Sequence, residues 1–255
     1  MPVPVFTGKV LLEFASLAST NEYAQQLLAK QAVFEGTVIR ADYQTGGKGY
    51  AGNLWESEPG KNLLLSIILK PSFLLPKNQF FLNQAISLAV AETVREVTLM
   101  DEVKIKWPND IYYEDKKVGG ILIENAIQGN QLQHAVIGIG LNVNQKVFPS
   151  ELKHTTSLSL MAERELNLGS VLRALCEKTE SRYLQLRGNS IEQIQKDYMK
   201  QLYRNAEEAV FRANGKRFNA KIAGLTAEGK LILELNDHHE VFGFKEVEFI
   251  NPEYA

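Results

Sequence analysis

Apolar residues in this chain recur with two periods, one typical of buried strands and one typical of amphipathic helices. Residues 62–69 form an apolar run of strand length, whereas residues 77–97 carry apolar side chains at helical spacing, namely Phe80, Phe81, Ala85, Leu88 and Ala89. The same criteria predict strands at 9–14, 36–42, 103–107, 112–113, 117–127 and 132–143, and helices at 23–32, 170–187 and 191–202. This mixture favours an α/β (α+β) fold, in which a mixed sheet is flanked by helices.

After about residue 205 the pattern changes to short strands separated by turn residues. Strands are predicted at 208–212, 217–225, 230–235 and 240–244, and Asn214-Gly215 is a strong hairpin signal between the first two. Several short strands in one short segment predict a small β-barrel of the SH3 type. We therefore expect two domains, residues 1–204 and residues 205–255.

Composition excludes several classes of function. The chain has 255 residues and a formal net charge of -2, from 28 basic and 30 acidic side chains, which gives no general electrostatic attraction to DNA or to an acidic membrane. No apolar stretch is long enough to span a bilayer, and no signal peptide is visible. Cys176 is the single cysteine, so an intramolecular disulfide is impossible. We expect a cytoplasmic protein.

The first candidate for a functional site is a glycine-rich loop. Residues 44–52 read Gln-Thr-Gly-Gly-Lys-Gly-Tyr-Ala-Gly, which cannot form regular structure. The loop is not a phosphate-binding Walker loop, because Gly49 follows Lys48 where Ser or Thr is required. Glycines allow backbone N–H groups to close around a ligand, although a flexible surface loop is the alternative.

Two further polar segments follow. In Lys106-Trp107-Pro108-Asn109-Asp110, the proline blocks a helix and presents Asn109 and Asp110 at a strand end, unless the segment is an ordinary turn. Lys117 precedes two glycines inside an apolar strand, where a lysine needs a partner or an anionic ligand unless it lies at the strand edge. A glycine loop, a rigid polar turn and a lysine together suit an enzyme that activates a carboxylic acid with ATP.

The segment at residues 138–144, Gly-Ile-Gly-Leu-Asn-Val-Asn, does not match a dinucleotide-binding loop, because Val143 occupies the third glycine position. Its glycines instead allow a ligand to approach a strand, and Asn142 supplies an amide. The four histidines show no metal-ligand spacing, so no protein metal site is expected.

In their order and spacing these segments resemble biotin protein ligases of the short kind. The motifs that carry the resemblance are Ser19-Thr20-Asn21, Gln44-Thr45-Gly46-Gly47-Lys48-Gly49, Gly52-Asn53-Leu54-Trp55, Lys106-Trp107-Pro108-Asn109-Asp110, Lys117-Val118-Gly119-Gly120-Ile121-Leu122 and Gly138-Ile139-Gly140-Leu141-Asn142. The N-terminal helix-turn-helix of the repressor-type members is absent, so no operator binding is expected.

This resemblance implies a class II aminoacyl-tRNA synthetase-like catalytic domain, followed by an SH3-like barrel, and a reaction in two steps. Biotin and ATP, with Mg²⁺ expected, form biotinyl-5'-AMP and pyrophosphate, and a lysine of a biotin carboxyl carrier domain then takes the biotin and releases AMP. An exposed sheet edge would allow two copies of the chain to form a homodimer. Lipoate ligation and a non-catalytic biotin or nucleotide sensor are the alternatives.

The resemblance also assigns roles on the biotin side of the site. Ser19, Thr20 and Gln44 would hydrogen-bond the ureido head of biotin, while Gly47 and Gly120 would allow close approach of the backbone. Lys117 would hold the biotin carboxylate and then neutralise charge on the phosphate.

On the nucleotide side, Asp110 would orient Lys117 or the incoming amine, and Lys48 would assist from the loop. Asn53, Asn109 and Asn142 would contact the nucleotide, and Trp55 would help to order the loop. Here Lys48 stands in place of an arginine of many members, Tyr50 and Ala51 stand where one or two more basic residues are common, and Asn53 is also uncharged. Fewer positive charges should retain biotinyl-AMP less tightly.

Overall fold

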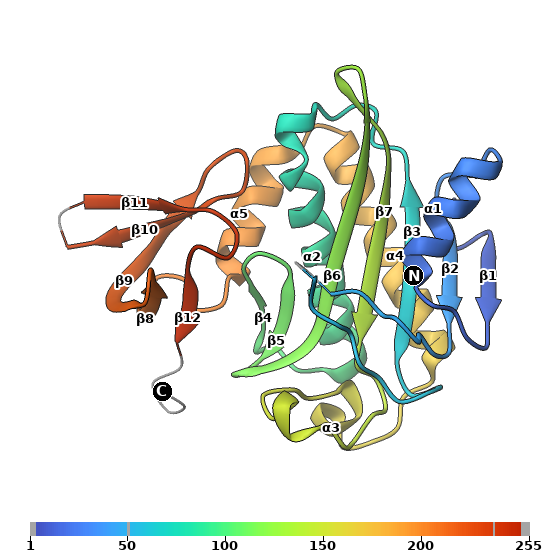
Figure 1. The fold of residues 1–255 in the computed structure, drawn as a ribbon, viewed down its shortest axis with the longest axis horizontal. Helices are drawn as coiled ribbons and strands as arrows, with labels where there is room; N and C mark the ends of the chain where they lie inside the picture. Colours follow the sequence, from blue (N-terminus) through green and yellow to red (C-terminus); the bar gives the residue numbers. More distant parts are fainter. Residues whose placement is uncertain (1–3, 50–51, 237, 251–255) are drawn as a thin grey trace.

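Two β-sheets of different size organise the chain (Figure 1). The computed structural model describes residues 4–49, 52–236 and 238–250, so Tyr50 and Ala51, where the loop departs from the family pattern, lie outside the described residues. The larger sheet has seven strands, β1 (Leu11–Phe14), β2 (Thr37–Ala41), β3 (Leu63–Leu69), β4 (Val103–Lys106), β5 (Asp110–Tyr113), β6 (Lys116–Gln128) and β7 (Gln131–Leu141). Their order across the sheet is β1-β2-β3-β7-β6-β5-β4.

The sheet is mixed, because β1 pairs with β2 in parallel and the other neighbouring strands pair antiparallel. Helices cover it: α1 (Thr20–Lys30), α2 (Phe80–Thr98), α3 (Leu158–Ala162), α4 (Leu168–Arg187) and α5 (Ile191–Gln201), with 3-10 turns at Pro76–Asn78 and Ser150–Leu152. None of the helices in the described ranges is long and apolar enough to cross a membrane.

Both faces of the central strands are buried, which explains the apolar run in β3. Ile67 belongs to the main core with α2 and α4, whereas its neighbour Ile68 packs with Ala24 and Leu27 of α1. Successive side chains of a strand point to opposite faces, so α1 lies on the face opposite α2 and α4. Ser66 shares the α1 face, and its position there places a hydroxyl beneath the start of α1.

The smaller sheet is antiparallel and contains β8 (Glu208–Ala213), β9 (Lys216–Leu225), β10 (Leu231–Leu235), β11 (His238–Phe242) and β12 (Glu248–Ile250), in the order β11-β10-β9-β8-β12. It packs against the large sheet through Trp107, whose indole N–H donates to Gly229 O at 2.8 Å. Phe244 adds ring contacts with Trp107 and Phe80, at centroid distances of 5.3 and 6.0 Å.

The predicted fold class is confirmed: a mixed sheet with helices precedes a second, antiparallel sheet. The sequence Ser19-Thr20-Asn21-Glu22 matches a capping box with Ser19 as the N-cap, and Ser19 Oγ does accept a hydrogen bond from Glu22 N at 3.4 Å. The helix therefore begins at Thr20, earlier than the expected range of 23–32. Helix α3 and strand β12 were not predicted, since five and three residues are too few to show a period. The domain boundary near residue 204 stays a prediction; it falls between the end of α5 and the start of β8.

Candidate active site

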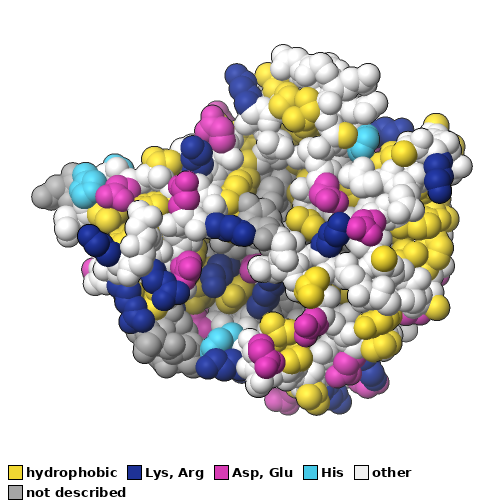
Figure 2. All heavy atoms as spheres, viewed as in Figure 1, with side chains coloured by type: hydrophobic (Ala, Val, Ile, Leu, Met, Phe, Trp, Pro, Cys, Tyr) yellow, Lys and Arg dark blue, Asp and Glu magenta, His cyan; other side chains and the backbone are white. Residues whose placement is uncertain are grey.

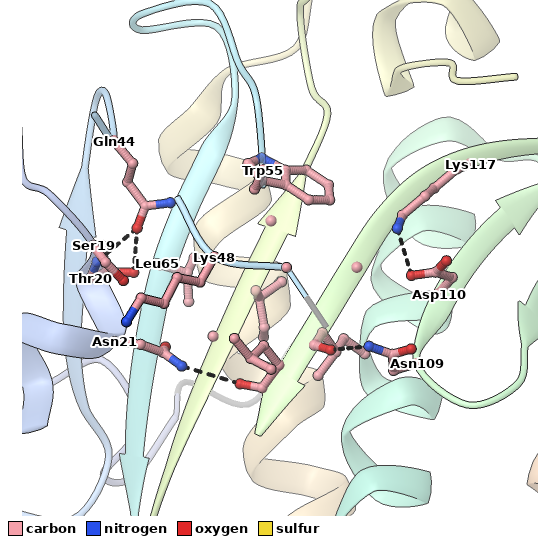
Figure 3. A pocket seen from close by; sticks show the side chains of 17 residues that line it. Ser19, Thr20, Asn21, Gln44, Lys48, Trp55, Leu65, Asn109, Asp110 and Lys117 are labelled. Carbon is pink, nitrogen blue, oxygen red and sulfur yellow. Dashed lines mark hydrogen bonds and ion pairs between the residues drawn. The ribbon is translucent and has the colours of Figure 1, made fainter. Parts of the chain in front are cut away.

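The candidate site is a cavity on the α1 face of the large sheet (Figure 3). The N-terminus of α1, the glycine loop, the β4–β5 turn and the floor of β6 and β7 surround it. Nine of the predicted residues line it: Ser19, Thr20, Gln44, Lys48, Trp55, Asn109, Asp110, Lys117 and Gly120. The fold therefore brings most of the predicted residues together, although they span about a hundred positions in the chain.

At the α1 end of the cavity a buried polar network holds Thr20 and Asn21. Gln44 Oε1 accepts from Thr20 N at 2.7 Å and from Thr20 Oγ1 at 3.0 Å. Ser66 Oγ lies 2.8 Å from Thr20 Oγ1 and 2.6 Å from Asn21 Oδ1. Asn21 Nδ2 donates to Glu124 Oε2 at 2.8 Å. Because each side chain is fixed by another, this end presents donors and acceptors in fixed positions to a polar, uncharged group.

Sequence reasoning assigned no role to Asn21, Ser66 or Glu124. Asn21 belongs to the Ser19-Thr20-Asn21 motif, so the roles expected for Ser19 and Thr20 could have indicated a role for Asn21 as well. Ser66 was the polar residue in an otherwise apolar strand, and it is fully buried. A buried hydroxyl needs a hydrogen-bond partner, and that requirement could have identified it.

Glycines form the floor of the cavity. Gly120 on β6 pairs directly with Gly140 on β7, and Gly138 lies two residues away on the same face. A β-carbon on Gly140 would lie 2.5 Å from the Trp55 ring, and one on Gly138 would lie 2.5 Å from Asn21 Oδ1. The floor must therefore lack side chains for Trp55 and Asn21 to occupy their positions.

Trp55 covers part of this floor. Its indole N–H is buried and has no hydrogen-bond partner among the described residues. The remaining cavity measures about 40 Å³, far below the several hundred Å³ (roughly 300–1,000) of a typical small-molecule pocket. An organic ligand can therefore enter only if Trp55 and its loop move aside, and an acceptor on that ligand would satisfy the indole N–H.

Lys117 and Asp110 form an ion pair at the end of the cavity away from α1. Lys117 Nζ lies 2.7 Å from Asp110 Oδ1, and both side chains are about one-third to one-quarter exposed, at 31% and 25%. Asp110 pairs with Gly120 across β5 and β6, which aims its carboxylate over the glycine floor. The ammonium also lies 5.6 Å from the centroid of the Trp55 ring. Of the alternatives that the sequence left open for Lys117, the structure shows a partner, which is Asp110.

Asn109 is buried, and its Nδ2 donates to Ile121 O at 2.6 Å while Ile121 N donates to Asn109 O at 2.9 Å. These two bonds fix the β4–β5 turn to β6 and thereby position Asp110. A contact of Asn109 with a nucleotide stays a prediction.

Lys48 points toward α1 and away from Lys117 (Figure 3). Its Nζ lies 2.5 Å from Glu22 Oε1, and both side chains are about half exposed. The hydrogen bond to Glu22 and the charge of that carboxylate raise the pKa of Lys48 above its ordinary value. Glu22 therefore pairs with the loop instead of completing the capping box at Ser19.

Three predicted residues lie outside the cavity lining. Gly47 accepts from Trp55 N at 2.9 Å, and a β-carbon on it would meet Trp55 O at 2.6 Å. Asn53 is exposed, and its carbonyl accepts from Gly49 N at 2.7 Å. Asn142 is buried, and its Nδ2 donates to Thr156 O at 3.1 Å. These residues shape the loop and a neighbouring connection here; their ligand contacts stay predictions.

Asp110 is the one carboxylate among the described residues that line the cavity. No group of three or more His, Cys, Asp or Glu side chains in the described part of the chain is arranged to hold a metal ion. A metal ion in this cavity would therefore need ligands from a bound substrate, as Mg²⁺ commonly has from nucleotide phosphates.

Known proteins similar to this chain include biotin ligases. Residues 13–142 match the model of the Biotin/lipoate A/B protein ligase family. The bifunctional ligase/repressor BirA of Bacillus subtilis is 34% identical over 236 residues, covering 90% of this chain and 71% of that protein. The biotin–[acetyl-CoA-carboxylase] ligase of Mycobacterium tuberculosis is 30% identical, covering 72% of this chain and 67% of that protein.

Solved structures extend the likeness to the fold. The biotin protein ligase of Aquifex aeolicus in complex with biotin and ATP superposes with a TM-score of 0.80 at 26% identity, covering 95% of this chain and 99% of that one. The Leishmania major enzyme in complex with biotinyl-5-AMP gives a TM-score of 0.60 at 25% identity, covering 92% and 99%. On its sequence and its fold, this chain belongs to the biotin/lipoate A/B protein ligase family.

Proposed function

We infer that this chain is an ATP-dependent biotin–protein ligase, which activates biotin as biotinyl-5'-AMP and transfers it to a lysine of a biotin carboxyl carrier domain. The observation that carries this inference is a cavity with hydroxyl and amide groups in a hydrogen-bonding network at one end and the Lys117–Asp110 pair at the other. Relatives named as biotin ligases, among them one crystallised with biotin and ATP, support the choice of biotin over lipoate.

Biotin has matching chemistry at its two ends, a neutral ureido ring and a carboxylate. We propose that the ring binds at Ser19, Thr20 and Gln44, and that the carboxylate lies near Lys117. The Lys117 ammonium would neutralise the carboxylate as it approaches the α-phosphate of ATP and then the charge that grows on that phosphate. Trp55 would move off the glycine floor and cover the adenylate instead.

In the second step the acceptor lysine must attack the mixed anhydride as a neutral amine. Asp110 lies beside the anhydride in this arrangement and would orient the amine and Lys117 through hydrogen bonds. No enzyme side chain would be covalently modified.

Mg²⁺ would arrive with ATP, where it would neutralise phosphate charge. Asp110 would supply one carboxylate oxygen to it, which suits an ion that takes most of its ligands from substrate phosphates and water. A cytoplasmic location, a homodimer and the absence of DNA binding remain predictions from the sequence.

The loop composition adds a proposal about the intermediate. Lys48 is the one basic residue between Gly46 and Gly52, so the loop should hold biotinyl-AMP less tightly than an arginine-rich loop does. Release of labelled biotinyl-AMP from the enzyme, measured by rapid filtration, should be faster than from a relative with a basic loop. Equal or slower release would contradict the proposal.

The function is tested by supplying labelled biotin, ATP and a purified carrier domain to the enzyme. A biotin ligase labels the carrier in an ATP-dependent manner, whereas a sensor leaves it unlabelled. A lipoate ligase labels it only when lipoate replaces biotin. If a well-folded protein transferred no biotin to the carrier domain, the proposal would be wrong.

A further inference from the structure

A row of polar side chains from three elements runs from β6 to the α1 end of the cavity. Asn21 Nδ2 lies 2.8 Å from Glu124 Oε2, and Asn21 Oδ1 lies 2.6 Å from Ser66 Oγ. Ser66 Oγ in turn lies 2.8 Å from Thr20 Oγ1, which lies 3.0 Å from Gln44 Oε1. We call these five side chains the hydrogen-bond relay. Thr20, Asn21 and Gln44 line the cavity (Figure 3), whereas Ser66 and Glu124 lie outside its lining and have no role in the proposed function.

Both amides of the relay have one allowed orientation. A carboxylate only accepts hydrogen bonds, so Asn21 must turn its NH₂ group toward Glu124 and its oxygen toward Ser66. At the other end, Thr20 N donates to Gln44 Oε1 at 2.7 Å, which keeps the amide oxygen of Gln44 on the side of Thr20. Turning either amide over would place two acceptors or two donors against each other.

Between these fixed ends the relay has fewer hydrogens than contacts. Three oxygen–oxygen contacts have to be joined, from Asn21 to Ser66, from Ser66 to Thr20 and from Thr20 to Gln44. The hydroxyls of Ser66 and Thr20 supply one hydrogen each, and the hydrogen bonds of the described residues bring no third. Two hydrogens for three contacts leave the relay one hydrogen short. Thr20, Asn21 and Ser66 are buried, so an oxygen pair without a hydrogen between its members is unfavourable there.

A ligand with an N–H group can supply the missing hydrogen. If an N–H donor approaches Gln44 Oε1 from the cavity, the Thr20 hydroxyl can turn its hydrogen to Ser66, and the Ser66 hydrogen stays on Asn21. Every oxygen of the relay then has a hydrogen to share. A ligand that offers only acceptors at this position leaves the shortage in place. The ureido ring of biotin carries two N–H groups, so the assignment to biotin rests on the proposed function.

We propose that Glu124 is a positioning residue that keeps the relay one hydrogen short and thereby makes the cavity select ligands with N–H donors. Glu124 acts through Asn21 and Ser66, because its carboxylate lies outside the cavity lining. The relay carries this constraint from β6 across α1 and β3 to Thr20 and Gln44, where the ligand binds.

The charge of Glu124 also reaches Lys48, and this second route has to be separated from the first. Lys48 Nζ lies 2.5 Å from Glu22 Oε1, and the hydrogen bond and charge of Glu22 raise the pKa of Lys48 more than the charge of Glu124 does. In the space-filling view, acidic and basic side chains lie close together on the surface between β6 and α1 (Figure 2). Glu22→Gln is therefore the matched control, because the Glu22 side chain contacts Lys48 more directly and hydrogen-bonds no member of the relay.

Glu124→Gln should supply the missing hydrogen from the protein itself. The new amide can donate to Asn21, which then turns over and donates to Ser66, and both hydroxyl hydrogens point along the relay toward Gln44. The ligand-free variant should melt about 2–4 °C above the wild type, the shift that one added hydrogen bond gives in a protein of this size. Biotin should bind about three- to tenfold more weakly in calorimetry, since its N–H group no longer meets a free acceptor. The KM for biotin should rise in parallel, while kcat of biotinyl-AMP formation stays the same.

Ser66→Ala interrupts the relay and tests the route. In that background, Glu124→Gln should not weaken biotin binding further, whereas independent effects of the two changes would add. Glu22→Gln should weaken biotin binding less than Glu124→Gln does. A melting temperature of Glu124→Gln that is unchanged or lower, an unchanged affinity for biotin, or additive effects in the double variant would each overturn the proposal. A larger effect of Glu22→Gln would also overturn it and assign the influence of Glu124 to Lys48.

Failure of the proposed function would look different. A wild-type protein that binds no biotin would refute biotin ligation, while the melting temperatures of the ligand-free variants would still decide whether the relay lacks a hydrogen.

Discussion

Replacing Lys117 by Met removes one positive charge from the site and keeps most of the side-chain stem. The stem matters because the Lys117 Cε lies 3.4 Å from the position of a β-carbon on Gly120, so it is part of the floor. The fold does not depend on the charge. The Lys117–Asp110 pair is about one-third to one-quarter exposed, and such pairs contribute roughly 0.2–1 kcal/mol to stability. The melting temperature should fall by less than about 4 °C.

Catalysis should respond far more strongly. Loss of one preorganised electrostatic contact to a developing charge costs about 3 kcal/mol, which corresponds to a rate about a hundredfold lower. The assay measures single-turnover formation of biotinyl-AMP from biotin and ATP, with pyrophosphate release as the readout. Circular dichroism and thermal unfolding of the same samples check the fold.

Lys116→Met is the control, because Lys116 is the exposed neighbour of Lys117 on the same strand. It should keep the wild-type rate. A Lys117→Met protein that formed biotinyl-AMP at nearly the wild-type rate would refute the electrostatic role of Lys117. A protein that failed to fold would refute the estimate for the ion pair.

Three further outcomes follow from the geometry. Gly140→Ala should weaken biotinyl-AMP binding about tenfold, since its β-carbon would fill floor space that the ligand takes when Trp55 moves away, and overpacking costs roughly 1–3 kcal/mol. Gly224→Ala, whose β-carbon would meet nothing closer than 4.0 Å, should have no effect in the same calorimetric titration. Adding biotin and ATP should change the tryptophan fluorescence of the wild-type protein, and the Trp55→Phe variant should show no such change. If the variant still shows it, the signal comes from Trp107, the other tryptophan of the chain, and the proposed movement of Trp55 is wrong. Burial raises the pKa of Cys176 to about 12, so iodoacetamide should label it only after unfolding, as mass spectrometry can show.

Local sequence signals were sufficient for much of the fold. Ser19 is the N-cap of α1 because its hydroxyl accepts a hydrogen bond from a free backbone N–H group. This helix-start signal depends only on three neighbouring residues. Asn214 and Gly215 both adopt positive φ and connect β8 to β9, as the dipeptide predicted. The apolar run of β3 likewise required two buried faces.

The site motifs were also present in the sequence, in an order that indicated the family and the chemistry of an anionic intermediate. What the sequence did not specify was which residues face one another across strands. Gly120 lies opposite Gly140 only because β6 and β7 pair in one register, and a shift of β6 by one residue would turn Gly120 to the face away from Gly140.

Tertiary structure alone decided the rest. Ser66 supports Thr20 because β3 passes beneath α1, and Trp55 rests on Gly140 because the loop folds back over the sheet. Lys106 and Arg217, which are more than a hundred residues apart, line one cavity because the small sheet packs on the large one. Periodicity and capping depend on neighbours within a few positions, whereas these contacts depend on strand register and sheet packing, which no short window of sequence contains.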